Sequence, residues 1–466
     1  MTKHYHLIGI GGIGMSGIAH LLLANGFKVS GSDIKETKIT QFLRSQGAQI
    51  FIGHNAEHIK QADVVVYSSA IKEDNPELVA AHKKNLLVIH RAQALAMLMR
   101  NKTVVAVSGS HGKTTTASLA SFLLLEAGLT PTIAVGGIIK NIGKNAEDNK
   151  GEFFVAEADE SDGSFLFYEP TYTIITNVDR EHLDYYRDFE QLKKAYADFI
   201  EKTASSGIAI CCADDVTLNL ITEHSNKKII TYSIEKKAPV YATNIKFHNL
   251  TSEFDCYYKE KLLGHFHLAL GGRHNVSNAL AVIALGMELG ISFEIISRTL
   301  SSYKGTARRL EVKFENSNLI ILDDYAHHPT EISATISAVR NLNFKRLVVV
   351  FQPHRFSRTK ILLSDFGYCF KEADVIVLTD IYPAHEQPID GINAQVVALQ
   401  IKNSFPEKDV FVVSKEKLSD FVYHFIIPGD CILFLGAGDI VKISDELVQR
   451  IKLCNSEATF KQFDYV

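Results

Sequence analysis

The stretch VVAVSGSHGKTTTASLASFLLLEAG, residues 104–128, decides the fold of the middle of this chain. It begins with a run of β-branched residues, passes through a turn that contains two glycines and ends in an apolar helical pattern. Backbone N–H groups at the start of a helix, together with the helix dipole, attract anions. The stretch therefore predicts a strand, a phosphate-binding turn and a helix in an α/β framework.

The turn is shorter than a standard P-loop, because Val107 stands where that pattern has its first glycine. Lys113 is expected against the β- and γ-phosphates of a nucleoside triphosphate, and the Thr114 hydroxyl is expected on Mg²⁺. A lysine followed by three threonines at such a turn is hard to explain by packing. The residues predicted to hold the phosphates are Gly109, Ser110, His111, Gly112, Lys113, Thr114 and Thr115.

A second turn of nucleotide-binding type lies at the start of the chain, in LIGIGGIGMSGIAHLLLANGFKVSGSD, residues 7–33. Gly9, Gly11 and Gly14 form the pattern G-x-G-x-x-G, and Asp33 ends the next predicted strand. The glycines allow a diphosphate to approach the backbone, and the acidic residue can bond a ribose hydroxyl. NAD fits this pattern, and so does a UDP-sugar.

Acidic residues follow two further predicted strands. Four of them crowd directly after the strand EFFVA: Glu157, Asp159, Glu160 and Asp162. Mutual repulsion would be unfavourable without a cation nearby. His182 follows the next strand and is flanked by Asp179, Glu181 and Asp184. We therefore predict that Glu157 and His182 belong to a Mg²⁺ site beside the phosphate loop.

A third group of polar residues lies in LDDYAHHPTEI and FQPHRFSRT. Tyr325, His327 and His328 follow one predicted strand, and Arg355 and Arg358 follow another. Guanidinium groups bind carboxylates through two hydrogen bonds. The pair of arginines therefore indicates a site for a small carboxylic acid.

The whole chain reads as an α/β protein, because short β-branched runs alternate with amphipathic helical stretches. Its 466 residues are enough for about three domains. We predict an N-terminal Rossmann-like domain over 1–100, a central P-loop ATPase-like domain with a parallel sheet over 101–304, and a C-terminal Rossmann-like domain over 305–466.

Composition excludes several classes of partner. The formal net charge is −4 and no basic block occurs, which argues against nucleic acid. No apolar run approaches the roughly 20 residues of a membrane span, so we expect a cytoplasmic protein without a membrane partner. The six cysteines form no C-x-x-C pair and are expected to be buried reduced thiols. The chain is expected to be a monomer or a homodimer.

Taken in order along the chain, the motifs resemble the Mur ligase family, the ATP-dependent amide-forming enzymes of peptidoglycan synthesis. The resemblance rests on GIGGIGMSG, SGSHGKTTT, EADESD, NVDREHLD, GGRHNVSNALA, GTARRLE, DDYAHHPTE and FQPHRFSRT. It spans the whole chain and explains why one protein has two phosphate-type turns. The first turn is implied to hold UDP-N-acetylmuramate and the second ATP.

The resemblance also implies roles for individual residues. Those implied for the UDP-sugar are Gly11, Gly12, Ser16, Asp33, His54 and Ser68. Those implied for ATP, in addition to the loop, are His274 and Asn275 near the adenine, Asp324 at the ribose, and Arg309 or Arg308 at the γ-phosphate. Metal binding is implied for Thr114, Glu157 and His182, and the catalytic group is Lys113, Glu157, His182 and Arg309. The incoming L-alanine is implied to meet Tyr325, His327, Arg355 and Arg358.

Within the family, the chain looks most like the members that join L-alanine to the lactyl carboxylate of UDP-N-acetylmuramate. A relative that recycles a whole tripeptide onto the same sugar nucleotide is the alternative. FQPHRFSRT, with its two arginines, favours a small free amino acid. From other classes, an NAD-dependent dehydrogenase would explain only the first glycine turn, and a non-catalytic nucleotide-binding regulator would not need the predicted metal site.

Overall fold

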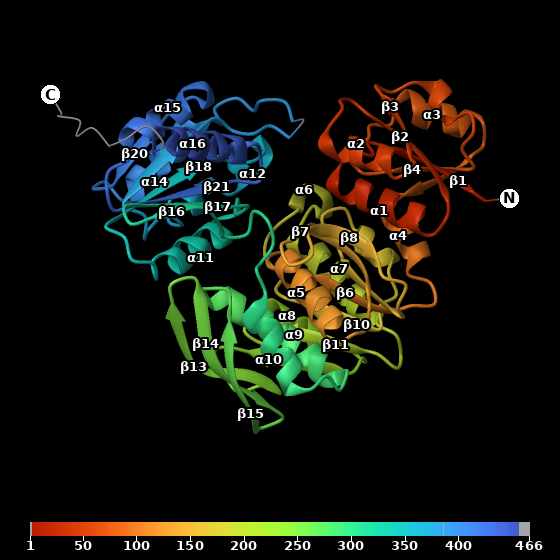
Figure 1. Cartoon of the computed structure of the whole chain (residues 1–466), viewed down its shortest axis with the longest axis horizontal. Helices are drawn as coiled ribbons and strands as arrows, with labels where there is room; N and C mark the ends of the chain where they lie inside the picture. The colour runs from red at the N-terminus through yellow and green to blue at the C-terminus, as the bar shows by residue number, and fades with distance from the viewer. Residues whose placement is uncertain (1, 385, 456–466) are drawn as a thin grey trace. The chain divides into compact units, whose positions relative to one another are not determined.

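The computed structural model describes residues 2–384 and 386–455, apart from the side chains of residues 184, 454 and 455. The chain divides into two compact units. Unit 1 comprises Met1–Lys246, Glu253–Leu270 and His274–Thr306, and unit 2 comprises Phe247–Ser252, Gly271–Arg273 and Ala307–Val466. Each unit is described by itself below, and Figure 1 labels the elements.

Unit 1 begins with a five-stranded sheet in the order β3-β2-β1-β4-β5. All its neighbouring strands are parallel. Its strands are β1 (His4–Ile8), β2 (Lys28–Asp33), β3 (Gln49–Ile52), β4 (Val64–Tyr67) and β5 (Leu87–His90). Its helices are α1 (Ile13–Ala24), α2 (Lys38–Ser45), the 3₁₀ helix η1 (Ala56–Ile59), α3 (Pro76–Lys83) and α4 (Arg91–Leu98). Parallel strands joined by helices place the loops after β1, β2 and β4 at one edge of the sheet.

A ten-stranded sheet follows in unit 1, in the order β15-β14-β13-β12-β11-β10-β6-β9-β7-β8. Its strands are β6 (Thr103–Ser108), β7 (Thr132–Ile139), β8 (Lys144–Asp148), β9 (Phe153–Glu157), β10 (Tyr172–Ile175), β11 (Ile208–Cys212), β12 (Ile229–Ser233), β13 (Val240–His248), β14 (Thr251–Tyr258) and β15 (Lys261–Leu268). Its helices are α5 (Lys113–Glu126), η2 (Ser164–Phe167), α6 (Leu183–Tyr186), α7 (Phe189–Glu201), α8 (Val216–Thr222), α9 (Arg273–Glu288) and α10 (Phe293–Ser302).

The middle of this sheet is parallel, as predicted, and β6 lies between β10 and β9. The strands at the two edges of this sheet were not predicted from the sequence. β7 and β8 form an antiparallel pair, and β13, β14 and β15 follow one another through two-residue connections that suit antiparallel neighbours. The regular alternation of strand and helix expected throughout therefore fails at both edges of this sheet.

Unit 2 contains a six-stranded sheet in the order β16-β17-β21-β18-β19-β20, parallel except for its first pair. Its strands are β16 (Glu311–Asn316), β17 (Leu319–Asp324), β18 (Arg346–Phe351), β19 (Val375–Leu378), β20 (Asp409–Val412) and β21 (Asp430–Leu435). Its helices are α11 (Pro329–Val339), α12 (Phe356–Ile361), α13 (Leu363–Phe366), α14 (Ala394–Ser404), α15 (Lys415–Phe425) and α16 (Ile440–Asn455). With its parallel sheets and three sheet-centred parts, the chain has the predicted α/β fold.

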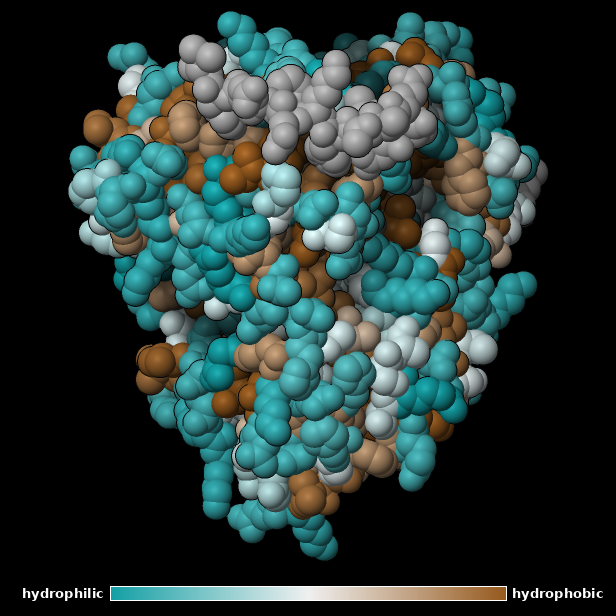
Figure 2. Space-filling view, turned by 60° about the vertical axis from the view of Figure 1, so that its left-hand side comes forward, coloured by the Kyte–Doolittle hydropathy of each residue, from teal (hydrophilic) through white to brown (hydrophobic). Residues whose placement is uncertain are grey.

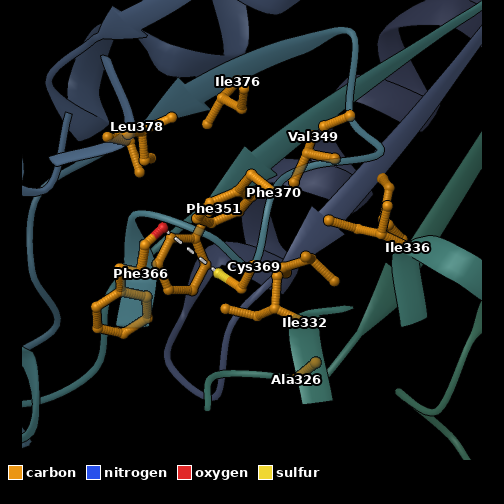
Figure 3. Packing of buried hydrophobic residues seen from close by; sticks show 14 of the residues in the cluster. Ala326, Ile332, Ile336, Val349, Phe351, Phe366, Cys369, Phe370, Ile376 and Leu378 are labelled. Atoms are coloured by element: carbon orange, nitrogen blue, oxygen red, sulfur yellow. Dashed lines mark hydrogen bonds between the residues drawn. The ribbon is translucent and has the colours of Figure 1, made fainter. Parts of the chain in front are cut away.

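An apolar core packs on one face of the unit 2 sheet, as Figure 3 shows. The Phe351 ring from β18 has its centroid 5.5 Å from those of Phe366 and Phe370. Ile332 and Ile336 from α11 belong to the same cluster and are fully buried. Close packing of this kind fixes the strand ends, where the polar side chains of the unit lie.

The five cysteines whose side chains are described are free and buried, as predicted: Cys211, Cys212, Cys256, Cys369 and Cys431. The Cys454 side chain lies outside the described residues. Figure 2 shows a face on which hydrophilic residues predominate and hydrophobic ones form small separate groups. Among the helices within the described residues, none combines the length and the apolar character needed to cross a bilayer.

Candidate active site

The predicted phosphate loop connects β6 to α5, and its two glycines have backbone angles that other residues rarely adopt. Gly109 has φ +130° and Gly112 has φ +82°. A Cβ atom at Gly109 would lie 2.1 Å from Thr176 Oγ1, and one at Gly112 would lie 2.6 Å from Asn278 Oδ1. Glycine is therefore required at both positions by conformation and by space.

Asn177, at the carboxyl end of β10, holds the loop from the neighbouring strand. Its Oδ1 accepts the His111 N–H at 2.8 Å, and its Nδ2 donates to the His111 carbonyl at 3.0 Å. Its own carbonyl accepts the Ser110 N–H at 3.1 Å. The sequence reading missed Asn177, although its place just after a strand that pairs with β6 was a usable signal.

Lys113, the first residue of α5, turns back over the loop. Its Nζ donates to the carbonyls of Gly109 at 2.6 Å and Ser110 at 3.1 Å, and to Glu160 Oε1 at 2.8 Å. Burial by itself would lower the pKa of Lys113, but the carboxylates of Glu160 and Asp159 outweigh burial and raise it. The ammonium group is therefore charged at neutral pH and contacts the carbonyls of the predicted phosphate loop.

Glu157, at the end of β9, lies beside the next loop residue. Its Oε1 accepts the Thr114 hydroxyl at 3.0 Å, and its Oε2 accepts the Gly136 N–H at 2.7 Å. Hydroxyl and carboxylate oxygens are ligands that Mg²⁺ takes beside phosphate groups. These two residues fit the metal role predicted for them.

His182 is grouped with different carboxylates. Its Nε2 lies 3.3 Å from Glu160 Oε1 and 3.7 Å from Glu181 Oε2. One ligand atom from each of these three residues lies within 4.8 Å of the other two. Burial lowers and Glu160 raises the pKa of His182, and the net shift is upward. The described contacts thus place Glu157 with Thr114, and His182 with Glu160, instead of joining Glu157 directly to His182.

The remaining two carboxylates of the acidic patch pair with Arg91, the first residue of α4. Its Nη2 lies 2.8 Å from Asp159 Oδ2 and 3.8 Å from Asp162 Oδ2. Ser69 also donates to Asp162, at 2.7 Å. Side chains of the protein thus offset the repulsion expected among the four carboxylates. Lys113 and His182 contact Glu160, and Arg91 contacts Asp159.

The N-terminal glycine turn connects β1 to α1. The Gly11 N–H donates to Asp33 Oδ2 at 2.9 Å, and a Cβ at Gly11 would lie 2.7 Å from that oxygen. Gly12 is the N-cap of α1, and the buried Ser16 donates its hydroxyl to the Ile13 carbonyl at 3.0 Å. The turn and the acidic residue predicted to bind one ligand therefore lie side by side.

His54 and Ser68 follow β3 and β4 at the same edge of this sheet. His54 Nδ1 lies 3.0 Å from the Ser32 hydroxyl, next to Asp33. The two chain neighbours of Ser68 line a cavity of about 620 Å³, whose lining residues are Tyr67, Ser69, Ile71, Lys72, Glu73, Leu78 and His82. Ile71 also approaches the glycine turn, since its Cδ1 lies 3.4 Å from the Cβ position of Gly9.

The residues expected near adenine lie at the start of α9. His274 and Asn275 occupy its first turn, and Asn275 is buried. Asn278, one turn further on, faces Gly112 of the phosphate loop. The sequence reading missed Asn278, which connects α9 to that loop.

In unit 2, Asp324 and the two arginines of GTARRLE lie close together. Asp324 is buried, and its oxygens accept the N–H groups of Leu310 at 2.5 Å and Ala326 at 2.7 Å. Arg308 donates to the Gly436 carbonyl at 2.6 Å. Arg309 lies over the Tyr325 ring, 5.1 Å from its centroid. Arg308 also lies over the Tyr325 ring, 4.9 Å from its centroid, and Arg309 Nη1 lies 4.0 Å from Glu331 Oε1, so both arginines contact this region of unit 2.

The residues predicted to meet the amino acid lie at the ends of β17 and β18. The His327 and His354 rings are 5.6 Å apart, and Arg358 Nη1 lies 3.1 Å from His354 Nδ1. Arg355 Nε lies 2.9 Å from Glu386 Oε1. Tyr325, His327, Arg355 and Arg358 thus belong to one polar region of unit 2, and Glu386 is a partner that the sequence reading missed.

Three family models match the chain in succession. The model described as Mur ligase family, catalytic domain, matches residues 4–103. The Mur ligase middle domain matches residues 107–286, and the Mur ligase, glutamate ligase domain, matches residues 308–438.

Individual relatives match over almost their whole length. A UDP-N-acetylmuramate–L-alanine ligase of Aquifex aeolicus is 47% identical over 452 residues, which are 97% of this chain and 98% of the relative. The enzyme of the same name from Geotalea uraniireducens is 45% identical over 447 residues, covering 96% and 98%. The crystal structure of the UDP-N-acetylmuramate–alanine ligase of Thermotoga maritima superimposes with a TM-score of 0.82 at 30% identity, covering 97% of this chain and 100% of that one. A murein peptide ligase of Psychrobacter arcticus shares the fold at 24% identity, with a TM-score of 0.70 and coverage of 96% and 98%.

Proposed function

This chain belongs to the Mur ligase family, and we propose that it is an ATP-dependent ligase that joins L-alanine to the lactyl carboxylate of UDP-N-acetylmuramate. The reaction forms ADP and phosphate in the synthesis of the peptidoglycan precursor. The observation that carries the proposal is the phosphate loop, with Lys113 held by Glu160, in a chain that matches ligases of this name over 96% or more of its length.

Amide formation from a carboxylate is uphill in water, so the carboxylate must first become a better electrophile. We propose that the lactyl carboxylate attacks the γ-phosphate of ATP, which gives an acyl phosphate and ADP. The amine of alanine then attacks the acyl carbon, and phosphate leaves. The first step brings a carboxylate against a triphosphate, and Lys113 and Arg309 are proposed to offset that repulsion.

Mg²⁺ would supply further positive charge at the phosphates and help to orient them. Thr114 and Glu157 are proposed to hold it, because their oxygens already lie 3.0 Å apart beside the loop. A second metal position is proposed at His182, where Glu160 Oε2 is buried and hydrogen-bonds no described residue.

The other predicted residues are assigned by their places in the fold. Gly11, Gly12, Ser16, Asp33, His54 and Ser68 are proposed to bind the sugar nucleotide. Gly109, Ser110, His111, Gly112, Thr115, His274, Asn275 and Asp324 are proposed to bind ATP. Tyr325, His327, Arg355 and Arg358 are proposed to bind alanine. Residues 1–100, 101–304 and 305–466 are the proposed limits of the corresponding domains. Because ATP is a substrate, we propose a cytoplasmic location.

The tripeptide-recycling ligase is the second candidate, because relatives named murein peptide ligases share the fold. The identity to curated alanine ligases, 44–47% over nearly the full chain, favours alanine.

The test is ADP release by the purified protein with ATP and UDP-N-acetylmuramate, adding L-alanine, serine, glycine or the tripeptide one at a time. We expect release with L-alanine at a rate at least tenfold above that with the tripeptide. Faster release with the tripeptide would establish the recycling reaction instead. The absence of release with every acceptor would contradict a ligase function.

A further inference from the structure

A carboxylate is completely buried among histidines in the N-terminal part of unit 1. Glu77, in the first turn of α3, has an exposed fraction of 0%. Its oxygens are approached by Ser32 Oγ at 2.5 Å, His58 Nδ1 at 2.7 Å, His54 Nδ1 at 3.1 Å, the Asn55 N–H at 3.4 Å and His6 Nε2 at 3.7 Å. None of these contacts was expected from the sequence.

Glu77 is ionised despite its burial. Burial by itself would raise the pKa of Glu77, but hydrogen bonds from His6, Ser32 and His58 outweigh it and lower the pKa to about 2. An ionised carboxylate only accepts hydrogen bonds. The Nδ1 atoms of His54 and His58 must therefore carry the protons that they share with it, and Nε2 of a neutral His54 is left as an acceptor.

His54 is connected through this network to the glycine turn. Its Nδ1 also lies 3.0 Å from the hydroxyl of Ser32, whose neighbour Asp33 accepts the Gly11 N–H. The Gly53 N–H donates to the Asp33 carbonyl at 2.8 Å. The position and tautomer of the His54 ring are thus determined by the same strand end that supports the turn.

The outer nitrogen of His54 is available for a ligand. The side chain is 19% exposed, and none of the described residues hydrogen-bonds its Nε2. His58, by contrast, is stacked on Phe51 with the ring centroids 4.2 Å apart and the planes at 7°. Glu77 therefore holds two histidine rings. The His58 ring packs against Phe51, and the His54 ring has an Nε2 that can accept a hydrogen bond.

We propose that Glu77 is a positioning residue for nucleotide binding, which fixes the Nδ1–H tautomer of His54 so that its Nε2 accepts a hydrogen bond from an N–H or hydroxyl of a uridine nucleotide. The inference rests on the proposed function only in taking this end of unit 1 as the sugar-nucleotide site. It adds a residue that itself touches no ligand.

The test is calorimetric binding of UDP to the full chain and to Glu77→Gln. The amide is uncharged and keeps only one of the two acceptor oxygens, so the proton on His54 Nδ1 is no longer required and the tautomer of His54 is no longer fixed. We expect the Kd for UDP to rise about tenfold, which is the effect of one well-placed hydrogen bond. The KM for the sugar nucleotide should rise similarly, with kcat and the Kd of ATP within about twofold of wild type. Glu57→Gln, on the exposed face of η1, is the matched control and should leave UDP binding unchanged.

A double-mutant cycle separates positioning from mere support of the fold. In a His54→Ala background, Glu77→Gln should change the Kd for UDP by less than about twofold, because its effect passes through His54. ¹⁵N spectra should show an unprotonated Nε2 for His54 in the wild type, and a protonated fraction of this nitrogen should appear in Glu77→Gln. If Glu77→Gln does not fold, Ser32→Ala provides the same comparison, with an expected rise in Kd of about two- to fivefold.

If Glu77→Gln raised the Kd for UDP equally in the wild-type and His54→Ala backgrounds, the positioning role would be overturned. An unchanged tautomer of His54 in Glu77→Gln would overturn it as well. Wild-type binding of UDP with a Kd unaffected by Glu77→Gln would also overturn it while leaving the proposed function intact. Failure of the wild type to bind UDP would instead remove the sugar-nucleotide assignment, and the inference with it.

Discussion

At the residue scale, the ammonium group of Lys113 is held over the phosphate loop by two carbonyls and Glu160. A ligand phosphate would meet a charge that is already oriented, and such preorganised charge acts most strongly when negative charge is transferred. We expect Lys113→Ala to lower kcat by about 100- to 1,000-fold. The Kd for UDP, which is proposed to bind at the other turn, should change by less than about twofold.

Steady-state kinetics and calorimetry on the same preparation measure both quantities. Lys236→Ala, at an exposed position in the same unit, should retain wild-type values in both assays. A parallel loss of turnover and UDP binding in Lys113→Ala would contradict the separation of the two sites.

His354 gives unit 2 a dependence on pH. Burial, the neighbouring His327 and the two arginines Arg355 and Arg358 lower the pKa of His354 to about 3. Below pH 6.5 the unfolded chain takes up a proton on His354 that the folded unit does not. Through His354, unit 2 is therefore most stable above pH 6.5 and loses stability progressively as the pH falls towards 3. We expect the Tm of the unit 2 transition to fall by about 2–4 °C per pH unit between pH 6 and pH 4 from this residue.

Differential scanning calorimetry of wild type and His354→Gln at pH 7, 6, 5 and 4 isolates that contribution. The variant should lose less Tm than the wild type over this range. Identical slopes for the two proteins would show that His354 is protonated as readily in the folded unit as in the unfolded chain.

At the scale of elements, the connection from β6 to α5 depends on glycine. Gly112→Ala would place a Cβ 2.6 Å from Asn278 Oδ1 at φ +82°, and displacement of α9 or of the loop would follow. We expect the Kd for ATP to rise at least tenfold, by calorimetry with a non-hydrolysable analogue.

Gly128→Ala is the matched control for this substitution. Gly128 follows α5 with φ +75°, and nothing lies within 4 Å of its Cβ position. It carries a similar conformational cost, of order 1 kcal/mol, without the collision. ATP binding as weak in Gly128→Ala as in Gly112→Ala would indicate loss of stability instead of distortion of the loop.

The acidic segment after β9 connects two parts of unit 1. Asp159 and Asp162 pair with Arg91 of α4, while Glu160 holds Lys113. A ligand that orders one part should therefore favour the other. We expect UDP-N-acetylmuramate to tighten binding of the ATP analogue, and Arg91→Ala to reduce that coupling about fivefold.

The coupling is the ratio of the two Kd values for the analogue, with and without sugar nucleotide. Arg44→Ala removes an exposed ion pair with Glu36 in the same part of the chain, and should leave the ratio unchanged. Full coupling in Arg91→Ala would show that the acidic segment does not transmit it.

These elements also show how far sequence patterns reach. The phosphate turn was predictable because the strand, glycines and helix are adjacent in the chain. The partner of Asp159 was not, because Arg91 lies 68 residues away and meets it only through packing. The same holds for Glu77, whose partners come from β1, the end of β2, and the segment after β3.

At the scale of the whole molecule, three sheet-centred parts each present polar side chains at the carboxyl ends of parallel strands. The order of their motifs was sufficient to predict the α/β class and the Mur ligase family. The β7–β8 pair and the strands β13–β15 escaped prediction, because half-exposed edge strands have weaker apolar patterns than buried parallel ones. Their positions had to come from the structure.

The central claim is that the middle phosphate loop activates a sugar carboxylate by phosphorylation. The most direct test uses UDP-N-acetylmuramate labelled with ¹⁸O in its lactyl carboxylate, with ATP and L-alanine, followed by mass spectrometry of the released phosphate. Attack of the carboxylate on the γ-phosphate predicts one ¹⁸O atom in each phosphate released. Unlabelled phosphate formed at the rate of the amide product would contradict the account.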